Sequence, residues 1–303
     1  MRLLVIVNVN AQSVTPWTVE VIERALASEF KVDLVRTKRK EHAMHLARGA
    51  VHEGFDAVAS FGGDGTVNEV ANGLAGSDLP MAIIPGGGTN VLARSLGIPR
   101  DPIEATWFLI ANRRHQPRRV SLGRAEGRYF TFGCGVGLDG AIVRDVERRQ
   151  ILKKGLGNSY FVLSALRIFF GGVDRRRPVI RLRWGPNLEQ EQDGLYLAIS
   201  QKTRPFTYLG HREMHVCPRA SFDRGLDCFA TSSLRTDVIL RIVAQTFGSR
   251  RHIRSPHALY VEDQPRFEIT SESPLPVQMD GEYIGDRTRI LLESVPDALS
   301  LLY

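Results

Sequence analysis

An alternation of short apolar runs with helical patterns, from residue 2 to about 112, constrains the fold more than any other feature. Between the runs, apolar residues recur every three or four positions, as in amphipathic helices. Thr15 followed by Pro16 predicts a helix start, and Gly54 lies where the second helix should end. Runs of strand length occur at residues 3–7, 32–35, 56–61 and 81–85. The pattern predicts a parallel sheet with helices on both faces and ligands at the carboxyl ends of its strands.

The rest of the chain has a different pattern. Apolar and polar residues alternate with period two between frequent turn residues, which is typical of antiparallel strands. Two segments with helical spacing, 155–170 and 236–247, are exceptions, and an Arg-, His-, Gln- and Pro-rich tract at 112–119 separates the two patterns. Because 303 residues exceed what one core usually supports, we expect an α/β domain at 1–117 and a β-rich domain at 118–303. An alternative is that the last residues of the chain pack back on the first domain.

Charge and cysteine content narrow the class of protein. Lys and Arg outnumber Asp and Glu by 40 to 33, and this net charge of +7 indicates an anionic partner such as a nucleotide, a phosphorylated metabolite, a nucleic acid or a membrane surface. Cys134, Cys217 and Cys228 are too widely spaced for a disulfide framework or a CxxC metal site, which favours a reducing compartment. The first apolar run stops at Asn8, too early for a signal peptide or a membrane span.

The most informative local motif is GGDGT at residues 62–66, which follows the third expected strand and enters a helix. Its glycines let the backbone approach a ligand closely, and the helix N-terminus offers N–H groups and the positive end of its dipole. An acid beside phosphates is repulsive unless a divalent cation bridges them or the acid handles a proton. Asp64 therefore points to Mg²⁺-dependent phosphoryl transfer. The alternative is a glycine-rich turn in which Asp64 is only the N-cap.

A second glycine-rich motif, PGGGTN at residues 85–90, ends the next expected strand. Two such loops at the same edge of a parallel sheet are expected to line one crevice. Neither loop matches the Walker A pattern or the GxGxxG dinucleotide pattern. In the second half of the chain, we interpret GCGVG at residues 133–137 as close packing of a strand and a turn.

The two loops belong to a larger constellation. It comprises GGDGT at 62–66 with Asn68-Glu69 and Asn72-Gly73, PGGGTN at 85–90 with Ala93-Arg94, and Asp280-Gly281-Glu282. Together these residues resemble the diacylglycerol kinase catalytic-domain family, which includes bacterial lipid kinases and the sphingosine and ceramide kinases. GGDGT is shared with NAD kinases and, more loosely, with phosphofructokinases, whereas VNEVANGL at 67–74 suits the lipid-kinase branch. The alternatives are an NAD kinase-like or other small-molecule kinase and a non-catalytic nucleotide or lipid sensor.

The resemblance implies an ATP- and Mg²⁺-dependent lipid kinase that phosphorylates a hydroxyl of diacylglycerol or a related lipid. It implies an N-terminal nucleotide-binding α/β domain, a C-terminal antiparallel β-sandwich-like domain, and ATP in the cleft between them. Asp280 and Glu282 would reach the reaction centre, with Glu282 or Asp64 as general base, although Asp280-Gly281 is also typical of a hairpin turn. The residues that the resemblance places at the nucleotide are Asn8, Thr37, Gly62, Gly63, Asp64, Gly65, Thr66, Glu69, Gly87, Gly88 and Thr89.

This chain departs from the family pattern in three places. Val9 stands where the family usually has proline, and Thr89 stands one position after the family's threonine. Family members with a structural Mg²⁺ bind it near an Asp-Gly turn that follows an alanine in the second domain. Here Arg224 separates Asp223 from Gly225. Asp223 is therefore a metal candidate that an ordinary turn explains equally well.

The expected partners follow from the lipid substrate and the charge. Arginine clusters at 113–119, 175–177 and 250–254, with the half-apolar segment 156–170, are candidates for contact with an anionic membrane surface. Core packing of that segment is the alternative. We expect a cytoplasmic, peripherally membrane-associated protein and allow for a homodimer. We expect no nucleic-acid partner, because no zinc-finger, homeodomain or RRM signature occurs.

Overall fold

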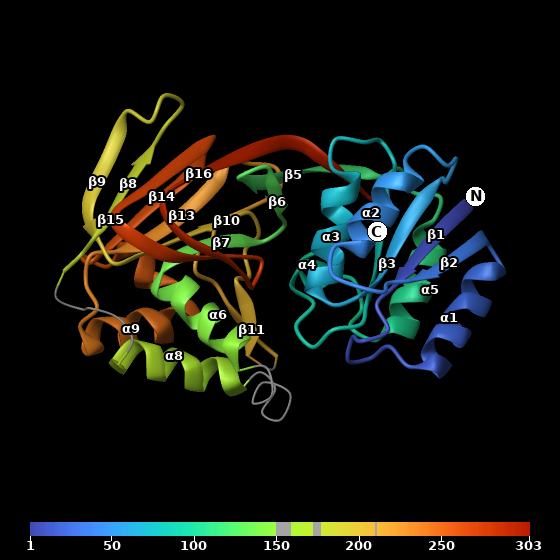
Figure 1. Cartoon of the computed structure of the whole chain (residues 1–303), viewed down its shortest axis with the longest axis horizontal. Coiled ribbons are helices and arrows are strands. Elements are labelled where there is room, and N and C mark those ends of the chain that lie inside the picture. Colours follow the sequence, from blue (N-terminus) through green and yellow to red (C-terminus); the bar gives the residue numbers. More distant parts are fainter. Residues whose placement is uncertain (150–158, 172–176, 210) are drawn as a thin grey trace. The chain divides into compact units, whose positions relative to one another are not determined.

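The structure is a computed structural model that describes residues 1–149, 159–171, 177–209 and 211–303. The chain divides into two compact units, which Figure 1 shows in colours that follow the sequence. Unit 1 comprises Met1–Leu122 together with Pro296–Tyr303, and unit 2 comprises Gly123–Val295. The chain thus starts in unit 1, builds unit 2 and returns to unit 1.

Unit 1 is built on a parallel sheet with the strand order β4-β3-β1-β2. These strands are β1 (Arg2–Val7), β2 (Lys31–Arg36), β3 (Ala57–Gly62) and β4 (Met81–Pro85). The returning chain places Leu301 beside Met81 of β4, also in parallel. Every residue of β3 and β4 is buried, as expected for strands with helices on both faces. The predicted α/β architecture of this half is confirmed.

The helices of unit 1 alternate with its strands. They are α1 (Pro16–Ala27), α2 (His42–Ala50), α3 (Asp64–Leu74), α4 (Val91–Ser95) and α5 (Pro102–Asn112). The predicted start of α1 is confirmed, because Thr15 and Thr18 each accept a hydrogen bond from the other's N–H in a capping box before Pro16. Apolar residues of α1 and α5, such as Leu26 and Leu109, pack with the sheet in one core cluster.

Unit 2 is built from antiparallel strands, as predicted. The central order is β14-β13-β10-β7-β15-β16, with β8 and β9 continuing from β15 and with β5 and β6 continuing from β16. The bounds are β5 (Arg118–Ala125), β6 (Arg128–Phe130), β7 (Gly133–Gly137), β8 (Ile180–Trp184), β9 (Gln190–Leu195), β10 (Leu197–Gln201), β13 (Leu226–Thr231), β14 (Ala258–Gln264), β15 (Arg266–Met279) and β16 (Glu282–Leu301). A separate hairpin joins β11 (Thr207–Leu209) to β12 (Arg212–Met214). One apolar cluster, which includes Phe130, Leu182 and Phe267, packs between these strands.

The helices of unit 2 are α6 (Leu138–Arg148), α8 (Ser159–Gly171), α9 (Thr236–Thr246) and the short 3-10 helix η1 (Arg251–Arg254). The helices predicted at 155–170 and 236–247 correspond to α8 and α9, although residues 155–158 lie outside the described part. The sequence did not predict α6, because Gly137 and Gly140 flank and interrupt its first turn and conceal its helical spacing. None of the described helices has the length and apolar character to cross a membrane.

Candidate functional site

The two glycine-rich loops of unit 1 lie against each other at the carboxyl edge of its sheet. The first follows β3 and the second follows β4, and the N–H of Gly86 donates to the Gly62 carbonyl at 2.7 Å. A Cβ on Gly87 would lie 2.7 Å from Gly63 Cα, closer than real Cβ contacts come. Glycine is therefore required for the two backbones to meet, and the predicted proximity of the loops is confirmed.

Asp64 is the first residue of α3 and connects the two loops. Its Oδ1 accepts a hydrogen bond from the N–H of Val91 at 2.6 Å, so Asp64 caps the neighbouring helix α4. The N-cap of α3 is Gly63, which has no side chain with which to cap the helix. Gly65, in the same first turn, is exposed. The N-terminus of α3 thus combines an exposed glycine, the positive end of a dipole and a half-buried carboxylate.

Asn90 closes the second loop. Its Oδ1 accepts from the N–H of Gly87 at 3.0 Å, and its Nδ2 donates to the Gly87 carbonyl at 2.7 Å. Asn90 has a positive φ of 49°, which asparagine tolerates better than most residues. This closure leaves Gly88 exposed and Thr89 half-buried at the tip of the loop.

Two further predicted residues lie at the same edge of the sheet. Asn8 follows β1, and its Nδ2 donates to Thr66 Oγ1 at 3.0 Å, which fixes the amide at the start of α3. Thr37 follows β2, next to β1 in the sheet. The sequence did not indicate Gln12, whose Oε1 lies 2.9 Å from the place a Cβ on Gly88 would take. Gln12 lies in an irregular loop, where no spacing rule applies.

Glu69 has a structural role that the sequence did not suggest. It lies one turn into α3, and its two carboxylate oxygens accept hydrogen bonds from the N–H groups of Glu41 and Ala43 at 2.9 and 3.0 Å. These donors belong to the N-terminus of α2, where the N-cap Glu41 makes no side-chain cap of its own. Glu69 therefore caps α2, and its contact with a nucleotide stays a prediction.

Asp280 is a buried carboxylate in the hairpin between β15 and β16. Asp280 and Gly281 both have positive φ, 48° and 77°, so the hairpin-turn alternative is confirmed. Oδ2 accepts from the N–H and hydroxyl of Thr131 at 2.6 and 2.8 Å, and Oδ1 accepts from the N–H groups of Phe132 and Gly133 at 2.9 and 3.0 Å. Burial raises the pKa of Asp280, and these hydrogen bonds lower it. The carboxylate thus anchors the turn.

Glu282 begins β16, immediately after this turn. Its Oε2 accepts from Arg128 Nη2 at 2.5 Å, and a quarter of its side chain is exposed. The N–H of Tyr283 donates to Glu147 of α6 at 2.9 Å, which holds the strand against that helix. Of the two acids in the Asp280-Gly281-Glu282 motif, Glu282 is the one that solvent reaches.

Asp139, the second residue of α6, is an acid that sequence reasoning missed. Its Oδ2 accepts from Gln278 Nε2 at 2.7 Å, and Gln278 Oε1 accepts from the N–H of Gly281 at 2.9 Å. Gly135 makes room for Asp139, since a Cβ there would lie 1.7 Å from Oδ2, and the close packing predicted for residues 133–137 is confirmed. Burial raises the pKa of Asp139 to about 6, against the lowering effect of the Gln278 hydrogen bond. An acid two residues after GCGVG was the signal available in the sequence.

Asp223 lies in an exposed turn. Its side chain is exposed, and its N–H donates to Ser221 Oγ at 3.3 Å, a local turn contact. Within the part of the chain that the structure describes, no three His, Cys, Asp or Glu side chains cluster closely enough to hold a metal ion.

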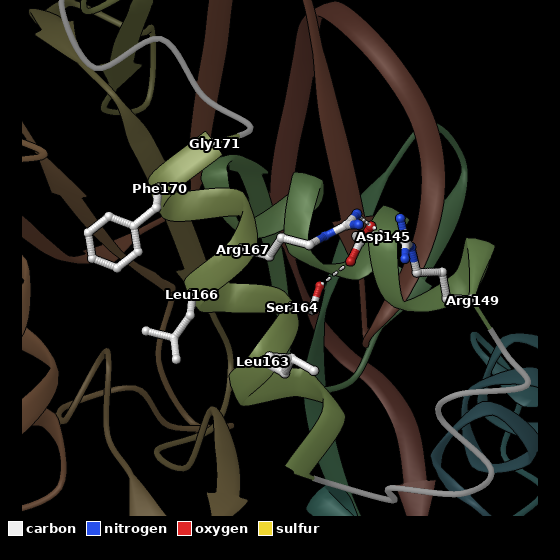
Figure 2. Close-up of a pocket in the computed structure, with 8 residues that line it drawn as sticks. All are labelled: Asp145, Arg149, Leu163, Ser164, Leu166, Arg167, Phe170 and Gly171. Carbon is white, nitrogen blue, oxygen red and sulfur yellow. Dashed lines mark hydrogen bonds and ion pairs between the residues drawn. The ribbon is translucent and has the colours of Figure 1, made fainter.

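A surface hollow of about 550 Å³ lies beside α6 and α8. Figure 2 shows Ser164 and Arg167 of α8 pointing toward Asp145 of α6, where Ser164 Oγ and Asp145 Oδ2 are 2.8 Å apart. Leu166 and Phe170 project from the other side of α8 and are 48% and 58% exposed. The helix therefore makes a buried polar contact with α6 and leaves an apolar face in solvent.

Known proteins share these loops and this fold. The family model of the diacylglycerol kinase catalytic domain matches residues 2–125, which include both glycine loops. The diacylglycerol kinase of Bacillus subtilis (strain 168) is 27% identical over 271 residues, which cover 88% of this chain and 84% of that protein. The "Probable lipid kinase YegS-like" of Stenotrophomonas maltophilia (strain K279a) is 29% identical over 256 residues, or 82% and 78% of the two chains.

A solved structure extends the likeness to the fold. The crystal structure of a diacylglycerol kinase from Bacillus anthracis str. Sterne matches with a TM-score of 0.72 at 21% identity and covers 100% of this chain and 96% of that one. At this identity the match shows a common fold. The family match and the sequence relatives lead to one conclusion: residues 2–125 form a diacylglycerol kinase catalytic domain, and the chain is similar over most of its length to bacterial diacylglycerol and lipid kinases.

Proposed function

We propose that this lipid kinase transfers the γ-phosphoryl group of ATP, with Mg²⁺, to a hydroxyl of diacylglycerol or a related lipid. The observation that carries the proposal is the meeting of two glycine loops at the N-terminus of α3, where a side chain on Gly87 has no room. Such a surface of backbone N–H groups suits phosphate oxygens. The name of the Bacillus subtilis relative supports diacylglycerol as the acceptor.

The residues of unit 1 suit a bound nucleotide and its metal. Backbone N–H groups of the first turn of α3 and of the exposed Gly88 tip would hold the phosphates, and Asn8 would fix Thr66 beside them. The carboxylate of Asp64 is the hard oxygen ligand that Mg²⁺ prefers. When bound, Mg²⁺ neutralises the charge on the transferred phosphoryl group.

The acidic residues of unit 2 would prepare the acceptor. We infer that either Glu282 or Asp64 is the general base that accepts the proton of the lipid hydroxyl. Both are partly exposed carboxylates. Asp280 acts as a positioning residue, because its hydrogen bonds fix the turn that presents Glu282. Asp139 supports the same turn through Gln278.

The test is transfer from γ-³²P-ATP with Mg²⁺ to mixed micelles that contain diacylglycerol, ceramide, sphingosine or monoacylglycerol, with NAD as a soluble control. We expect one lipid to be labelled, and the Asp64→Asn variant to label none while its melting temperature stays near that of the wild type. Near wild-type turnover in Asp64→Asn removes the role given to Asp64. Labelling of NAD alone removes the lipid substrate, and ATP binding without any labelling favours the sensor alternative.

We also propose that α8 makes the peripheral membrane contact. Its exposed residues Val162, Leu163, Leu166 and Phe170 give it an apolar face, and Arg149 and Arg167 border the adjoining hollow. An amphipathic helix with arginines at its border suits an anionic lipid surface. Of the predicted arginine cluster at 175–177, residues 175 and 176 lie outside the described part.

Vesicle sedimentation tests this contact. We expect the double variant Leu166→Ser/Phe170→Ser to bind phosphatidylglycerol vesicles about tenfold more weakly, because less apolar area enters the lipid. Trp107→Ser on α5 is the matched control, since Trp107 is 57% exposed and Phe170 is 58% exposed. Equal loss in both variants, or loss in neither, excludes α8 as the contact.

A further inference from the structure

A buried ammonium group lies against the turn at which the family resemblance suggested a metal. Lys202 directly follows β10 and has no exposed surface. Its Nζ donates to the carbonyls of Arg224 and Gly225, the second at 3.2 Å, and to Ser294 Oγ at 3.0 Å. An ammonium has three donors and no acceptor, so these three oxygens satisfy it.

The surroundings of Lys202 have the chemistry of a cation site. Carbonyl and hydroxyl oxygens are the ligands that hard divalent cations take in proteins. Burial lowers the pKa of Lys202 to about 8, against the raising effect of the carboxylates of Asp227, Asp263 and Asp223. The nearby carboxylates thus favour the charged form of this group.

We propose that the Lys202 ammonium is a built-in cation that takes the place of a structural divalent metal at the 220–225 turn, and that Asp223 binds no metal. Mg²⁺ needs its oxygen ligands at about 2.1 Å. With Nζ already in contact with the carbonyls of Arg224 and Gly225, a divalent ion on either oxygen would lie beside the ammonium and be repelled by it. The inference is independent of the proposed phosphoryl transfer.

The neighbouring contacts show what this cation holds together. Arg224 and Gly225 lead into β13, Ser294 lies in β16, and Lys202 follows β10, so one group joins three segments. A structural metal provides the same kind of cross-link. The turn is closed on its other side by the Gly225 N–H, which donates to Asp263 Oδ1 at 2.6 Å. The side chain of Asp223 is exposed.

Calorimetric melting of the full chain without nucleotide tests the proposal. We expect the wild-type melting temperature to be the same in EDTA and in millimolar Mg²⁺ or Ca²⁺. Lys202→Ala empties the oxygen cage, so its melting temperature should fall by about 5–10 °C and recover in part with either metal. Lys202→Met fills the cage with apolar atoms and should fall without recovery. Asp223→Asn, the matched control at the turn, should melt like the wild type.

Three results would overturn the inference. The first is a wild-type melting temperature that rises with Mg²⁺ and loses this rise in Asp223→Asn, because Asp223 then holds a metal. The second is a Lys202→Ala variant that melts like the wild type, and the third is one that metals restore no better than Lys202→Met. If Lys202→Ala does not fold, calorimetric titration of the wild type with Mg²⁺ decides, since stoichiometric binding without nucleotide contradicts the proposal and its absence supports it.

Discussion

Both units contain a glycine-rich strand end that leads into a helix with an acid in its first turn. In unit 1 this is β3 with Asp64, and in unit 2 it is β7 with Asp139. A Cβ on Gly65 of α3 would meet nothing within 4 Å, whereas a Cβ on Gly140 of α6 would lie 2.1 Å from the carbonyl oxygen of Pro276. The first junction is open to solvent and the second is filled by the protein itself.

The difference shows that a glycine run does not by itself predict a ligand site. In unit 1 the second loop packs against Gly63 but leaves Gly65, in the first turn of α3, exposed. In unit 2 Pro276 of β15 lies against Gly140 of α6. Asp139 accepts a hydrogen bond from Gln278, and Asp280 accepts one from the N–H of Thr131. The deciding difference is whether backbone covers the glycine in the first turn of the helix, because Gly65 of α3 is exposed and Gly140 of α6 lies against Pro276.

The largest loss of stability is expected when Asp280, the other buried acid of unit 2, is replaced. Asp280→Ala leaves the N–H groups of Thr131, Phe132 and Gly133 without their acceptor in a buried place. We expect the free energy of unfolding to fall by about 3–5 kcal/mol. Asp64→Ala, in the open junction, should cost about 1 kcal/mol through the lost cap of α4. Urea unfolding of both variants measures the difference, and equal losses would contradict the contrast.

Next in size is the effect of one methyl group in α6. Gly140→Ala forces a Cβ against the Pro276 carbonyl, so we expect a loss of about 3 kcal/mol in the free energy of unfolding. Alanine is the better helix former, so propensity alone predicts a gain. A variant more stable than the wild type in urea would show that unit 2 is not closed at this point.

A smaller effect should appear in the pH dependence. The pKa of Asp139 is raised from 3.8 to about 6 in the folded chain, so its stabilising contribution is complete below about pH 4 and is lost as the pH rises through 6. Between pH 4 and 7 the wild type should lose about 2 kcal/mol of unfolding free energy relative to Asp139→Asn. Parallel urea titrations across this range test it. Identical pH profiles would mean that Asp139 is ionised throughout.

The smallest effect concerns the open junction. Gly65→Ala adds a methyl group where nothing lies within 4 Å, so the free energy of unfolding should rise by about 0.5–1 kcal/mol. The same methyl group lies where phosphate oxygens are proposed to approach, so ATP should bind about tenfold more weakly. Isothermal titration with ATP and Mg²⁺ gives the affinity. Unchanged affinity would place the phosphates elsewhere.

Much of unit 1 could be predicted from the sequence, because its signals are local. Buried strands appear as continuous apolar runs, and β4 has the predicted bounds of 81–85. Thr15 and Pro16 marked the start of α1 through cap chemistry within four residues. The proximity of the glycine loops followed from a general property of parallel sheets, namely that their carboxyl ends share an edge.

The parts that could not be predicted depend on contacts distant in sequence. Glu69 caps α2 through the N–H of Ala43, which lies 26 residues earlier in the sequence. The hydrogen-bond donors to Asp280 lie 147–149 residues before it. The acceptors of Lys202 lie in a later turn and in β16. In α6, glycines needed for close packing against Pro276 concealed a helix from its own spacing. Local sequence patterns do not indicate such distant partners.

The return of the chain to unit 1 determines how this unit could be isolated. The N–H of Leu302 donates to the Met81 carbonyl at 2.9 Å, and the N–H of Gly76 donates to the Ala298 carbonyl at 2.8 Å. A fragment that stops at residue 125, where the family match ends, lacks both contacts and exposes the edge of β4 to pairing with other chains. A circular permutant that places residues 296–303 ahead of Met1 keeps the edge covered in one contiguous piece.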